Sequence, residues 1–196
     1  MNFCTQCGAG LVLLVPVGDN RLRHVCSGCG YIHYQNPKIV TGVIPEWEGR
    51  VLLCRRAIEP RHGFWTLPAG FMENGESADE GAAREAMEEA NARITITGLY
   101  TLFNLIHINQ VYMIYRGQLT DLDYSPGEES LEVGLFSGGE IPWDELAFQV
   151  VRETLGFYFQ DQVSGNFPLR SGTIDRSTKD QNCYRMRLLE GERFGA

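Results

Sequence analysis

Hydrophobic residues occur in short runs separated by turn signals, a pattern that predicts strands over much of the chain. The runs KIVTGVIPEW (38–47) and RVLLCRRA (50–57) are joined by a short turn at Glu48-Gly49. Farther along, three runs rich in β-branched and aromatic residues also predict strands: ITITGLYTLF, VYMIYRGQL and LEVGLF. The segment EPRHGFWTLPAG contains too much glycine and proline for a helix, so we expect a loop that enters an edge strand.

The pattern becomes helical after the turn signal Asn74-Gly75. Alanines recur every four residues from Ala78 to Ala90, and Ser77-x-x-Glu80 has the form of a capping box. We therefore expect a helix that ends near Ala90-Asn91 and packs its small residues closely on a sheet. A second helix is predicted to begin at IPWD (141–144) and to continue through AFQVVRETLGFYF.

Four of the six cysteines form two Cys-x-x-Cys pairs near the start of the sequence: Cys4, Cys7, Cys26 and Cys29. Two such pairs flanking a short predicted hairpin indicate a tetrahedral structural zinc site. The alternative is two disulfides, which require an oxidising compartment. Cys54 lies in an apolar run and Cys183 in a polar segment, and both are expected to be ordinary reduced cysteines.

The predicted elements group into a small unit and a larger one. Residues 1–35 are expected to form a zinc ribbon, for which metal binding would provide much of the folding energy. Asn36-Pro37 marks a boundary, because the residue before a proline is restricted to extended conformations. Residues 36–170 then predict a mixed α/β domain, and residues 171–196 a polar C-terminal tail without an assigned element.

The net charge of the chain restricts the classes of partner that it can bind. With 17 Lys and Arg against 25 Asp and Glu, the formal net charge is -8, which disfavours a broad nucleic-acid or membrane surface. A small anionic substrate remains compatible, because a metal ion can supply positive charge. The first residues, MNFCTQCG, lack the basic start and apolar core of a secretory signal, so we expect a cytoplasmic protein.

Three acidic residues, Glu85, Glu88 and Glu89, lie near the C-terminal end of the first predicted helix. At 100° per residue they share an arc of about 100° on one face. Acids in the last turn oppose the helix dipole by about 0.3–1 kcal/mol each, and like charges at i,i+4 repel one another. A hard cation such as Mg²⁺ or Mn²⁺ would remove both costs, whereas the alternative is a solvated acidic face.

The full spacing around these acids resembles the Nudix box, G-x5-E-x7-R-E-U-x-E-E-x-G-U, in which U is an apolar residue. The chain has Gly70-x5-Glu76-x7-Arg84-Glu85-x-x-Glu88-Glu89. Asn91 replaces the last glycine of the pattern, a mild departure because asparagine tolerates the left-handed conformation at a helix end. The U positions carry small alanines, Ala86 and Ala92.

The resemblance extends over residues 1 to about 165. The ribbon, YQNPK, VLLCRR, WTLPAGFMENGES and PGEESLE are similar to zinc-ribbon Nudix hydrolases that include the plastid FAD pyrophosphatase and bacterial ADP-ribose relatives. Related NADH pyrophosphatases carry an SQPWPFP array after the box, which this chain lacks. We therefore expect FAD or ADP-ribose as substrate, with NADH, or NAD at the end of an RNA, as the alternative.

The resemblance implies a Nudix α/β/α sandwich with a mixed sheet and a pyrophosphate hydrolase that uses Mg²⁺ or Mn²⁺ and releases AMP. Glu85, Glu88 and Glu89 would bind the metals. Gly70 would bring a backbone carbonyl near them, Arg84 would orient a carboxylate, and Glu76 would hold the loop or complete the metal shell. A small nucleotide is then the expected partner, without nucleic acid, and a homodimer is expected by the same resemblance.

Two further roles stay open at the sequence level. The general base is Glu85, Glu129 or Glu132, the last two also being compatible with a solvated loop. One of Arg55 and Arg56 is expected to contact phosphate, because alternation along a strand places them on opposite faces. Aromatic residues that would stack on a base, or else pack in the core, are Trp47, Phe64, Trp65, Phe71 and Tyr112.

Two other classes of protein fit part of this pattern. A non-catalytic nucleotide sensor would have the fold, but such proteins usually lose carboxylates of the box, and all are present here. A nucleic-acid-binding zinc ribbon is opposed by the acidic balance of the chain. An enzyme is the better hypothesis.

Overall fold

A computed structural model describes residues 1–176 and 184–189. The chain separates into two compact units, Met1–Pro37 and Lys38–Ala196, each described by itself. No helix within the described residues is long and apolar enough to cross a membrane. Cys183, expected to be reduced, lies outside the described residues.

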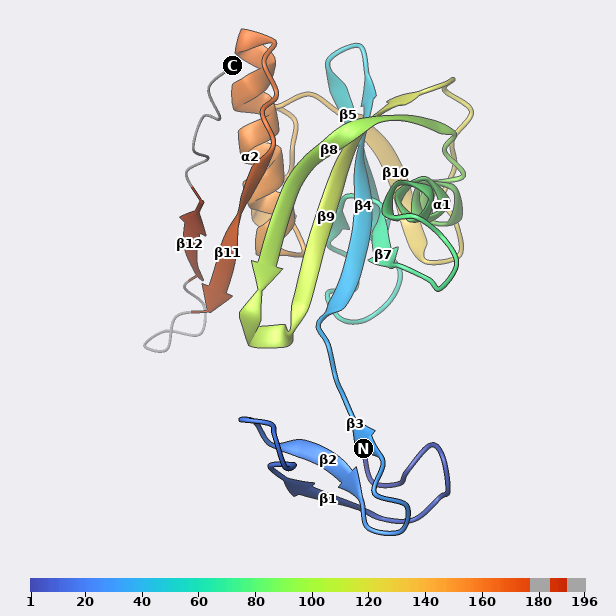
Figure 1. The fold of residues 1–196 in the computed structure, drawn as a ribbon. Helices are drawn as coiled ribbons and strands as arrows, with labels where there is room; N and C mark the ends of the chain where they lie inside the picture. Colours follow the sequence, from blue (N-terminus) through green and yellow to red (C-terminus); the bar gives the residue numbers. More distant parts are fainter. Residues whose placement is uncertain (177–183, 190–196) are drawn as a thin grey trace. The chain divides into compact units, whose positions relative to one another are not determined.

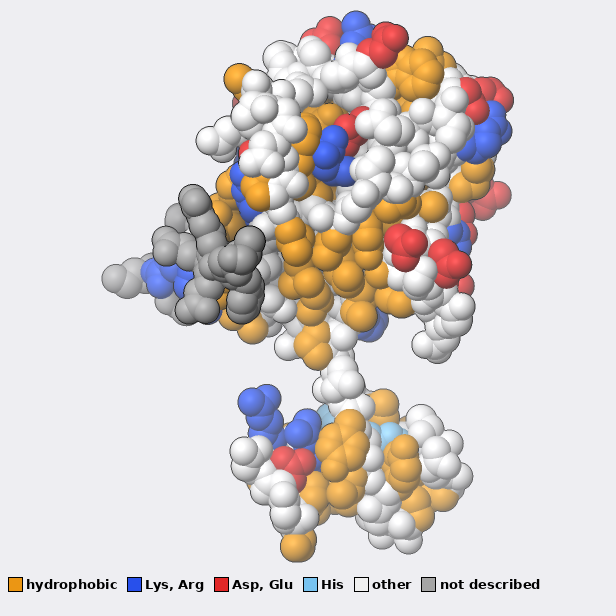
Figure 2. All heavy atoms as spheres, turned by 45° about the horizontal axis from the view of Figure 1, so that its top comes forward, with side chains coloured by type: hydrophobic (Ala, Val, Ile, Leu, Met, Phe, Trp, Pro, Cys, Tyr) orange, Lys and Arg blue, Asp and Glu red, His pale blue; other side chains and the backbone are white. Residues whose placement is uncertain are grey.

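The first unit is a three-stranded antiparallel sheet with the order β1 (Leu11–Leu14), β2 (Arg23–Cys26) and β3 (Ile32–His33). The predicted hairpin is present as β1 and β2, which pair Leu11 with Cys26. Hydrophobic side chains remain exposed on this unit, as Figure 2 shows, among them Val12, Leu13 and Val17. So little apolar burial leaves the cysteine cluster as the main source of stability.

The second unit contains a mixed sheet whose main path is β10-β5-β4-β9-β8-β11-β12, with β6 beside β5 and β7 beside β4 (Figure 1). Most neighbours are antiparallel, but β4 pairs in parallel with β9 and β11 pairs in parallel with β8. The strand bounds are β4 Lys38–Trp47, β5 Arg50–Arg56, β6 Trp65–Thr66, β7 Ala69–Phe71, β8 Ile94–Leu105, β9 Gln110–Leu119, β10 Ser130–Phe136, β11 Arg170–Arg176 and β12 Tyr184–Leu188.

Helices α1 (Ala78–Ala90) and α2 (Gln149–Ser164) cover opposite faces of this sheet (Figure 1). The alternation of β4 shows this directly, because successive side chains of a strand point to opposite faces. Val43 packs with Ala82 and Ala86 of α1. The next residue, Ile44, belongs to the large core that includes Leu155 of α2. The expected α/β/α sandwich is therefore confirmed.

The first helix matches its sequence signals at both ends. Ser77 and Glu80 form the capping box, and Asn91 ends the helix in the left-handed conformation with φ 47°. Three alanines of the four-residue repeat, Ala82, Ala86 and Ala90, are fully buried. Their small side chains let the helix pack closely on the sheet.

The start of the second helix was predicted wrongly. Residues 143–145 form only a short 3₁₀ turn, η2 (Trp143–Glu145), and α2 begins at Gln149. Leu146 makes a parallel bridge with Trp65, and the Ala147 amide donates to the Trp65 carbonyl. This pairing holds the chain extended up to residue 148 and delays the helix.

The C-terminal segment, for which no element was predicted, contributes two strands. β11 pairs with β8 over residues 170–174, and β12 pairs with β11. Ile174 of β11 is fully buried in the large core. The polar appearance of the segment hid this strand, because one buried side chain is too weak a pattern to detect.

Candidate active site and zinc centre

The three box glutamates project from the C-terminal half of α1 and differ in exposure. Glu85 and Glu89 are 8% and 7% exposed, whereas Glu88 is exposed. Figure 2 shows acidic side chains on the side of the larger unit that carries α1. Burial of two neighbouring carboxylates is costly unless positive charge or hydrogen bonds compensate it.

Arg84 gathers three carboxylates of the predicted site. Its guanidinium contacts Glu76 through two hydrogen bonds of 2.9 Å. One terminal nitrogen also donates to Glu85 at 2.8 Å and to Glu88 at 2.9 Å. The same side chain reaches the Phe71 carbonyl at 3.2 Å. Arg84 thus joins the loop before the helix to the acidic face, as expected of an orienting residue.

Glu89 is the carboxylate that the protein compensates least. Burial, and after it the Glu85 charge, raise its pKa to about 8, and the Ala69 amide, 3.4 Å away, opposes the rise. Burial also raises the pKa of Glu85. By contrast, the Arg84 hydrogen bonds lower the pKa of Glu76 to about 2. The Glu85–Glu89 pair therefore requires more positive charge than the described side chains supply.

The donor set at this position fits a hard divalent cation. It consists of carboxylate oxygens on one helix face, with no sulfur or imidazole ligand among them. Gly70 lies directly against this face, since a Cβ added there would lie 2.2–2.5 Å from the Glu85 carboxylate. A side chain at this position would displace the Glu85 carboxylate, so glycine here serves the position of that carboxylate rather than the backbone conformation.

The loop before β10 closes the site from the other side. The Gly127 amide donates to the Glu89 carbonyl at 3.0 Å, and a Cβ at Gly127 would lie 1.7 Å from the Glu88 carbonyl oxygen. Glu129, in the same loop, lines a cavity of about 650 Å³ together with the box glutamates. Glu132 does not line it. Its carboxylate lies 3.6 Å from Arg55.

The structure separates the two candidate arginines. Arg55 donates to the Gly63 carbonyl at 2.9 Å and pairs with Glu132. Arg56 lines the acidic cavity and has no salt bridge among the described residues. Its guanidinium lies 5.1 Å from the centre of the Phe148 ring. Of the two, Arg56 is therefore the one placed to meet an anion.

A second cavity of about 500 Å³ adjoins the acidic one and shares Arg56, Gly70 and Phe71 with it. Among the predicted aromatic residues, Phe71 and Tyr112 line it. Trp65 instead packs in the core against Phe136, Phe64 lies under Arg61, and Trp47 packs on a smaller core cluster. The prediction missed Phe148, because the misplaced second helix assigned that residue to a helix interior.

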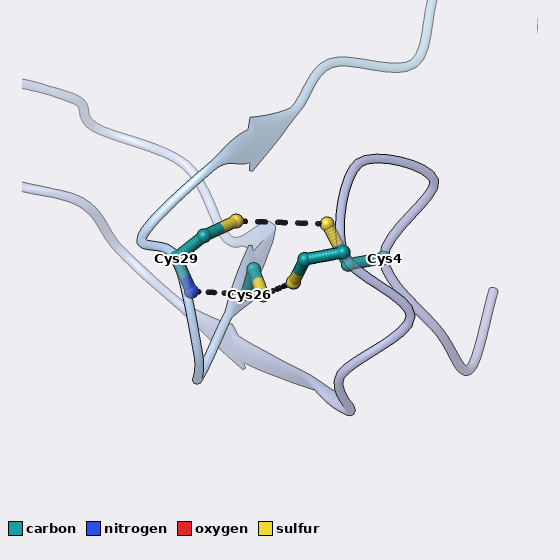
Figure 3. Close-up of side chains that lie close together, drawn as sticks. Cys4, Cys26 and Cys29 are labelled. Atoms are coloured by element: carbon teal, nitrogen blue, oxygen red, sulfur yellow. Dashed lines mark hydrogen bonds between the residues drawn. The ribbon is translucent and has the colours of Figure 1, made fainter.

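The four ribbon cysteines come together as a metal site. One ligand atom from each lies within 4.8 Å of the others. The sulfurs of Cys4 and Cys29 are 3.8 Å apart and those of Cys7 and Cys26 are 3.4 Å apart, and the close approach of Cys4, Cys26 and Cys29 is visible in Figure 3. Four sulfurs at about 2.3 Å from a tetrahedral zinc ion would be about 3.8 Å apart. The cluster therefore fits structural zinc.

Hydrogen bonds to sulfur support this fit. The amides of Gly28 and Cys29 each donate to the Cys26 sulfur at 3.3 Å, and the Cys29 amide is the largest contribution that lowers the Cys26 pKa to about 6. His33, which the sequence interpretation did not single out, lies with Nε2 3.4 Å from the Cys4 sulfur. Such contacts stabilise thiolates, the form that binds metal.

Comparison with protein families decides the classification. A family model described as "NUDIX domain" matches residues 36–154. The chain belongs to the Nudix family. A second model, "Nudix N-terminal" (Zn_ribbon_Nudix), matches residues 2–35, so this is a Nudix protein with an N-terminal zinc ribbon.

A Nudix hydrolase from Nitrosomonas europaea has a similar solved structure. It is 53% identical, covers 90% of this chain and 100% of its own, and superposes with a TM-score of 0.88.

Curated relatives carry more specific names. The "NAD-capped RNA hydrolase NudC" of Vibrio cholerae is 34% identical over 83% of this chain and 61% of that protein. The "ADP-ribose pyrophosphatase" of Methanocaldococcus jannaschii is 27% identical over 60% of this chain and 71% of that protein. The chain spans about half of another NudC relative, from Photobacterium profundum, with 52% of that protein covered.

Proposed function

We propose that this Nudix protein hydrolyses the pyrophosphate bond of a nucleoside diphosphate joined to a second group, with AMP as one product. The observation that carries the proposal is the buried Glu85–Glu89 pair, whose charge the described side chains compensate only in part, beside a cavity that Arg56 also lines. Bound to these carboxylates, Mg²⁺ or Mn²⁺ would supply positive charge for the phosphates and acidify the attacking water.

The residues of the chain have separate roles in this proposal. Glu85, Glu88 and Glu89 hold the cations, and Arg84 fixes the first two by its hydrogen bonds. Arg56 binds a phosphate oxygen at the boundary of the two cavities. Glu129 is a better candidate than Glu132 for accepting the proton of the water, because only Glu129 lines the acidic cavity.

Among substrates, the NAD type now ranks first, as NADH or as NAD at the 5′ end of RNA. Five of the curated relatives with the most significant similarity carry the name NAD-capped RNA hydrolase. The proposal therefore includes RNA with an NAD cap among the substrates, although the sequence analysis expected no nucleic-acid partner.

ADP-ribose and FAD form the second candidate class. The Methanocaldococcus jannaschii relative is named for ADP-ribose, and the SQPWPFP array of the NADH pyrophosphatases is missing from this chain.

A substrate panel with Mg²⁺ and Mn²⁺ tests the proposal. It contains NADH, NAD-capped RNA, ADP-ribose, FAD, a diadenosine polyphosphate and nucleoside triphosphates, with AMP release as the measurement. NADH or NAD-capped RNA should have the highest kcat/KM. A tenfold preference for FAD or ADP-ribose would reverse the ranking, and absence of hydrolysis of every diphosphate would overturn the activity.

The variant Glu89→Gln links that activity to the site. It should fold normally but lose at least about 100-fold in kcat, because charge stabilisation at a metal site contributes several kcal/mol. Glu48→Gln, the same chemical change at the turn between β4 and β5, is the matched control and should keep full activity. Near-normal turnover by Glu89→Gln would contradict the assignment.

A further inference from the structure

The second cavity has a wall built from the C-terminal strands, which lie outside the matched Nudix region. The family match ends at residue 154, whereas Arg176 of β11 and Tyr184 of β12 line the cavity. His107 of the short 3₁₀ turn η1 (Ile106–Ile108) lines it as well. Arg56 and Gly70 line it too and belong also to the acidic cavity, so the two cavities adjoin at these residues.

Contacts among these residues hold the C-terminal wall together. Arg176 pairs with Tyr184 in the strand register, donates to its hydroxyl at 3.3 Å and lies 5.7 Å from its ring centre. The His107 ring lies 5.9 Å from the Tyr184 ring at a steep angle, and its Nδ1 is 3.7 Å from the Asp175 carboxylate. The Arg176 side chain lines the cavity, and its contacts with Tyr184 fix its guanidinium beside that ring.

The lining indicates what the cavity would hold. Its volume of about 500 Å³ is within the range of about 300–1,000 Å³ usual for small-molecule sites. Aromatic and aliphatic side chains predominate, including Tyr112 and Phe148, and two amides, Gln110 and Gln149, also line it. Flat apolar walls with a few amide and guanidinium groups suit a planar nitrogen heterocycle, which can stack and form hydrogen bonds at its edge.

We propose that Arg176 and Tyr184 determine substrate specificity by binding the planar heterocyclic ring of the substrate, while Arg56 and the acidic helix hold its pyrophosphate. This inference rests on the proposed function, since it places the ring of one substrate in the second cavity and its pyrophosphate in the adjoining acidic cavity. The ring is either the adenine of the AMP half or the heterocycle of the second group.

Binding of half-substrates tests the inference without turnover. Calorimetric titration with AMP, nicotinamide mononucleotide and FMN is performed on the wild type, Arg176→Ala and Tyr184→Ala. Arg185→Ala is the matched control, because it removes the same charge from an exposed neighbour on β12 that does not line the cavity. Both test variants should weaken at least one of these ligands by about fivefold or more, and the control by less than about twofold.

The three titrations also identify which part of the substrate supplies the ring. A loss confined to AMP assigns adenine to the cavity, and a loss confined to a mononucleotide of the second group assigns that heterocycle. Equal affinities in all four proteins, or no measurable binding to the wild type, would overturn the inference. Tyr184→Phe, which keeps the ring but removes the hydroxyl that accepts from Arg176, should lie between the wild type and Tyr184→Ala.

Hydrolysis separates this inference from the proposed function. In NADH and ADP-ribose turnover, Arg176→Ala should raise KM and leave kcat within about twofold, the signature of lost uniform binding. A wild type that binds AMP through Arg176 but hydrolyses nothing would contradict only the proposed activity. A wild type that hydrolyses its substrate with an unchanged KM in Arg176→Ala would contradict only the specificity role.

Discussion

The carboxylate of Glu89 is buried in surroundings that disfavour its negative charge. It is 7% exposed, it accepts a hydrogen bond from the Ala69 amide at 3.4 Å, and the Glu85 charge repels it. Arg84 compensates Glu85 and Glu88 but, among the described residues, forms no hydrogen bond with Glu89. The local arrangement therefore favours either a proton or a metal ion at this residue, depending on pH and on the cation present.

The pH dependence of stability follows from that choice. The pKa of Glu89 is raised from 4.5 to about 8, so the protonated form is favoured in the metal-free folded protein. The stability that protonated Glu89 contributes to the folded state is fully present below about pH 4.5 and is lost as pH rises through about 8. At about pH 8.5 with chelator, Glu89→Gln should therefore raise the free energy of unfolding by about 1–3 kcal/mol.

Denaturant unfolding at several pH values measures this effect. Adding excess Mg²⁺ should stabilise the wild type more than Glu89→Gln, because the variant keeps only two of the three carboxylates proposed to hold the cation. If the two proteins have the same metal-free stability at all pH values, Glu89 is not the uncompensated group.

Arg56 and Arg55 provide a comparison at neighbouring positions of one strand. Arg56→Ala should lower kcat/KM by about tenfold or more, because it removes a charged hydrogen-bond donor from the substrate. Arg55→Ala should have a smaller effect on kcat/KM and lower stability slightly, since its contacts are Gly63 and Glu132. Steady-state kinetics and thermal unfolding of both variants check this, and equal kinetic losses would contradict the assignment.

At the scale of elements, the first helix is held between a glycine on each side. Gly70 of β7 lies against the Glu85 side chain, and Gly127 in the loop before β10 lies against the helix backbone at Glu88. The two close approaches differ physically. A carboxylate can rotate away from a new methyl group, whereas a backbone carbonyl in a helix cannot.

The two alanine variants should therefore separate activity from stability. Gly127→Ala should destabilise the protein by about 1–3 kcal/mol, because the loop and α1 must move apart. Gly70→Ala should unfold at nearly the wild-type temperature but lose at least about tenfold in kcat, because the Glu85 ligand is displaced. Thermal unfolding and kinetics on both proteins test this, and the reverse pattern would show that Gly70 has a structural role.

The elements also show where sequence patterns succeed. The first helix was predictable to its ends because its signals are local: a capping box at Ser77, a four-residue alanine repeat, and Asn91 at the stop. The second helix was placed too early because its start depends on Leu146 and Ala147 pairing with Trp65, about 80 residues away in the chain. No local pattern carries that information.

At the scale of the whole molecule, the two units depend on different sources of stability. The unit Lys38–Ala196 has a large core between sheet and helix, with Leu155, Phe103 and Ile44 fully buried. The unit Met1–Pro37 exposes much of its apolar surface and contains the four-cysteine cluster.

The homodimer expected from the family resemblance stays a prediction.

Removal of zinc should therefore unfold one unit and spare the other. In Cys26→Ser, amides of residues 1–35 should lose protection from hydrogen exchange, while amides of β4, β8 and β9 keep theirs. Zinc content measured on the same sample should fall to a small fraction of the wild-type value. A Cys26→Ser protein with a protected ribbon would contradict the structural role of the metal.

The sequence by itself determined the features whose physics is local or whose spacing is strict. These are the cysteine pairs, the capped acidic helix, the strand runs and the Nudix box, and the family comparison agrees with them. The tertiary structure decided which members of each set meet: Arg56 and not Arg55, Glu129 and not Glu132, Phe148 and not Trp65. Alternation along a strand limits such choices but does not make them, because the face that borders a cavity is set by packing between distant segments.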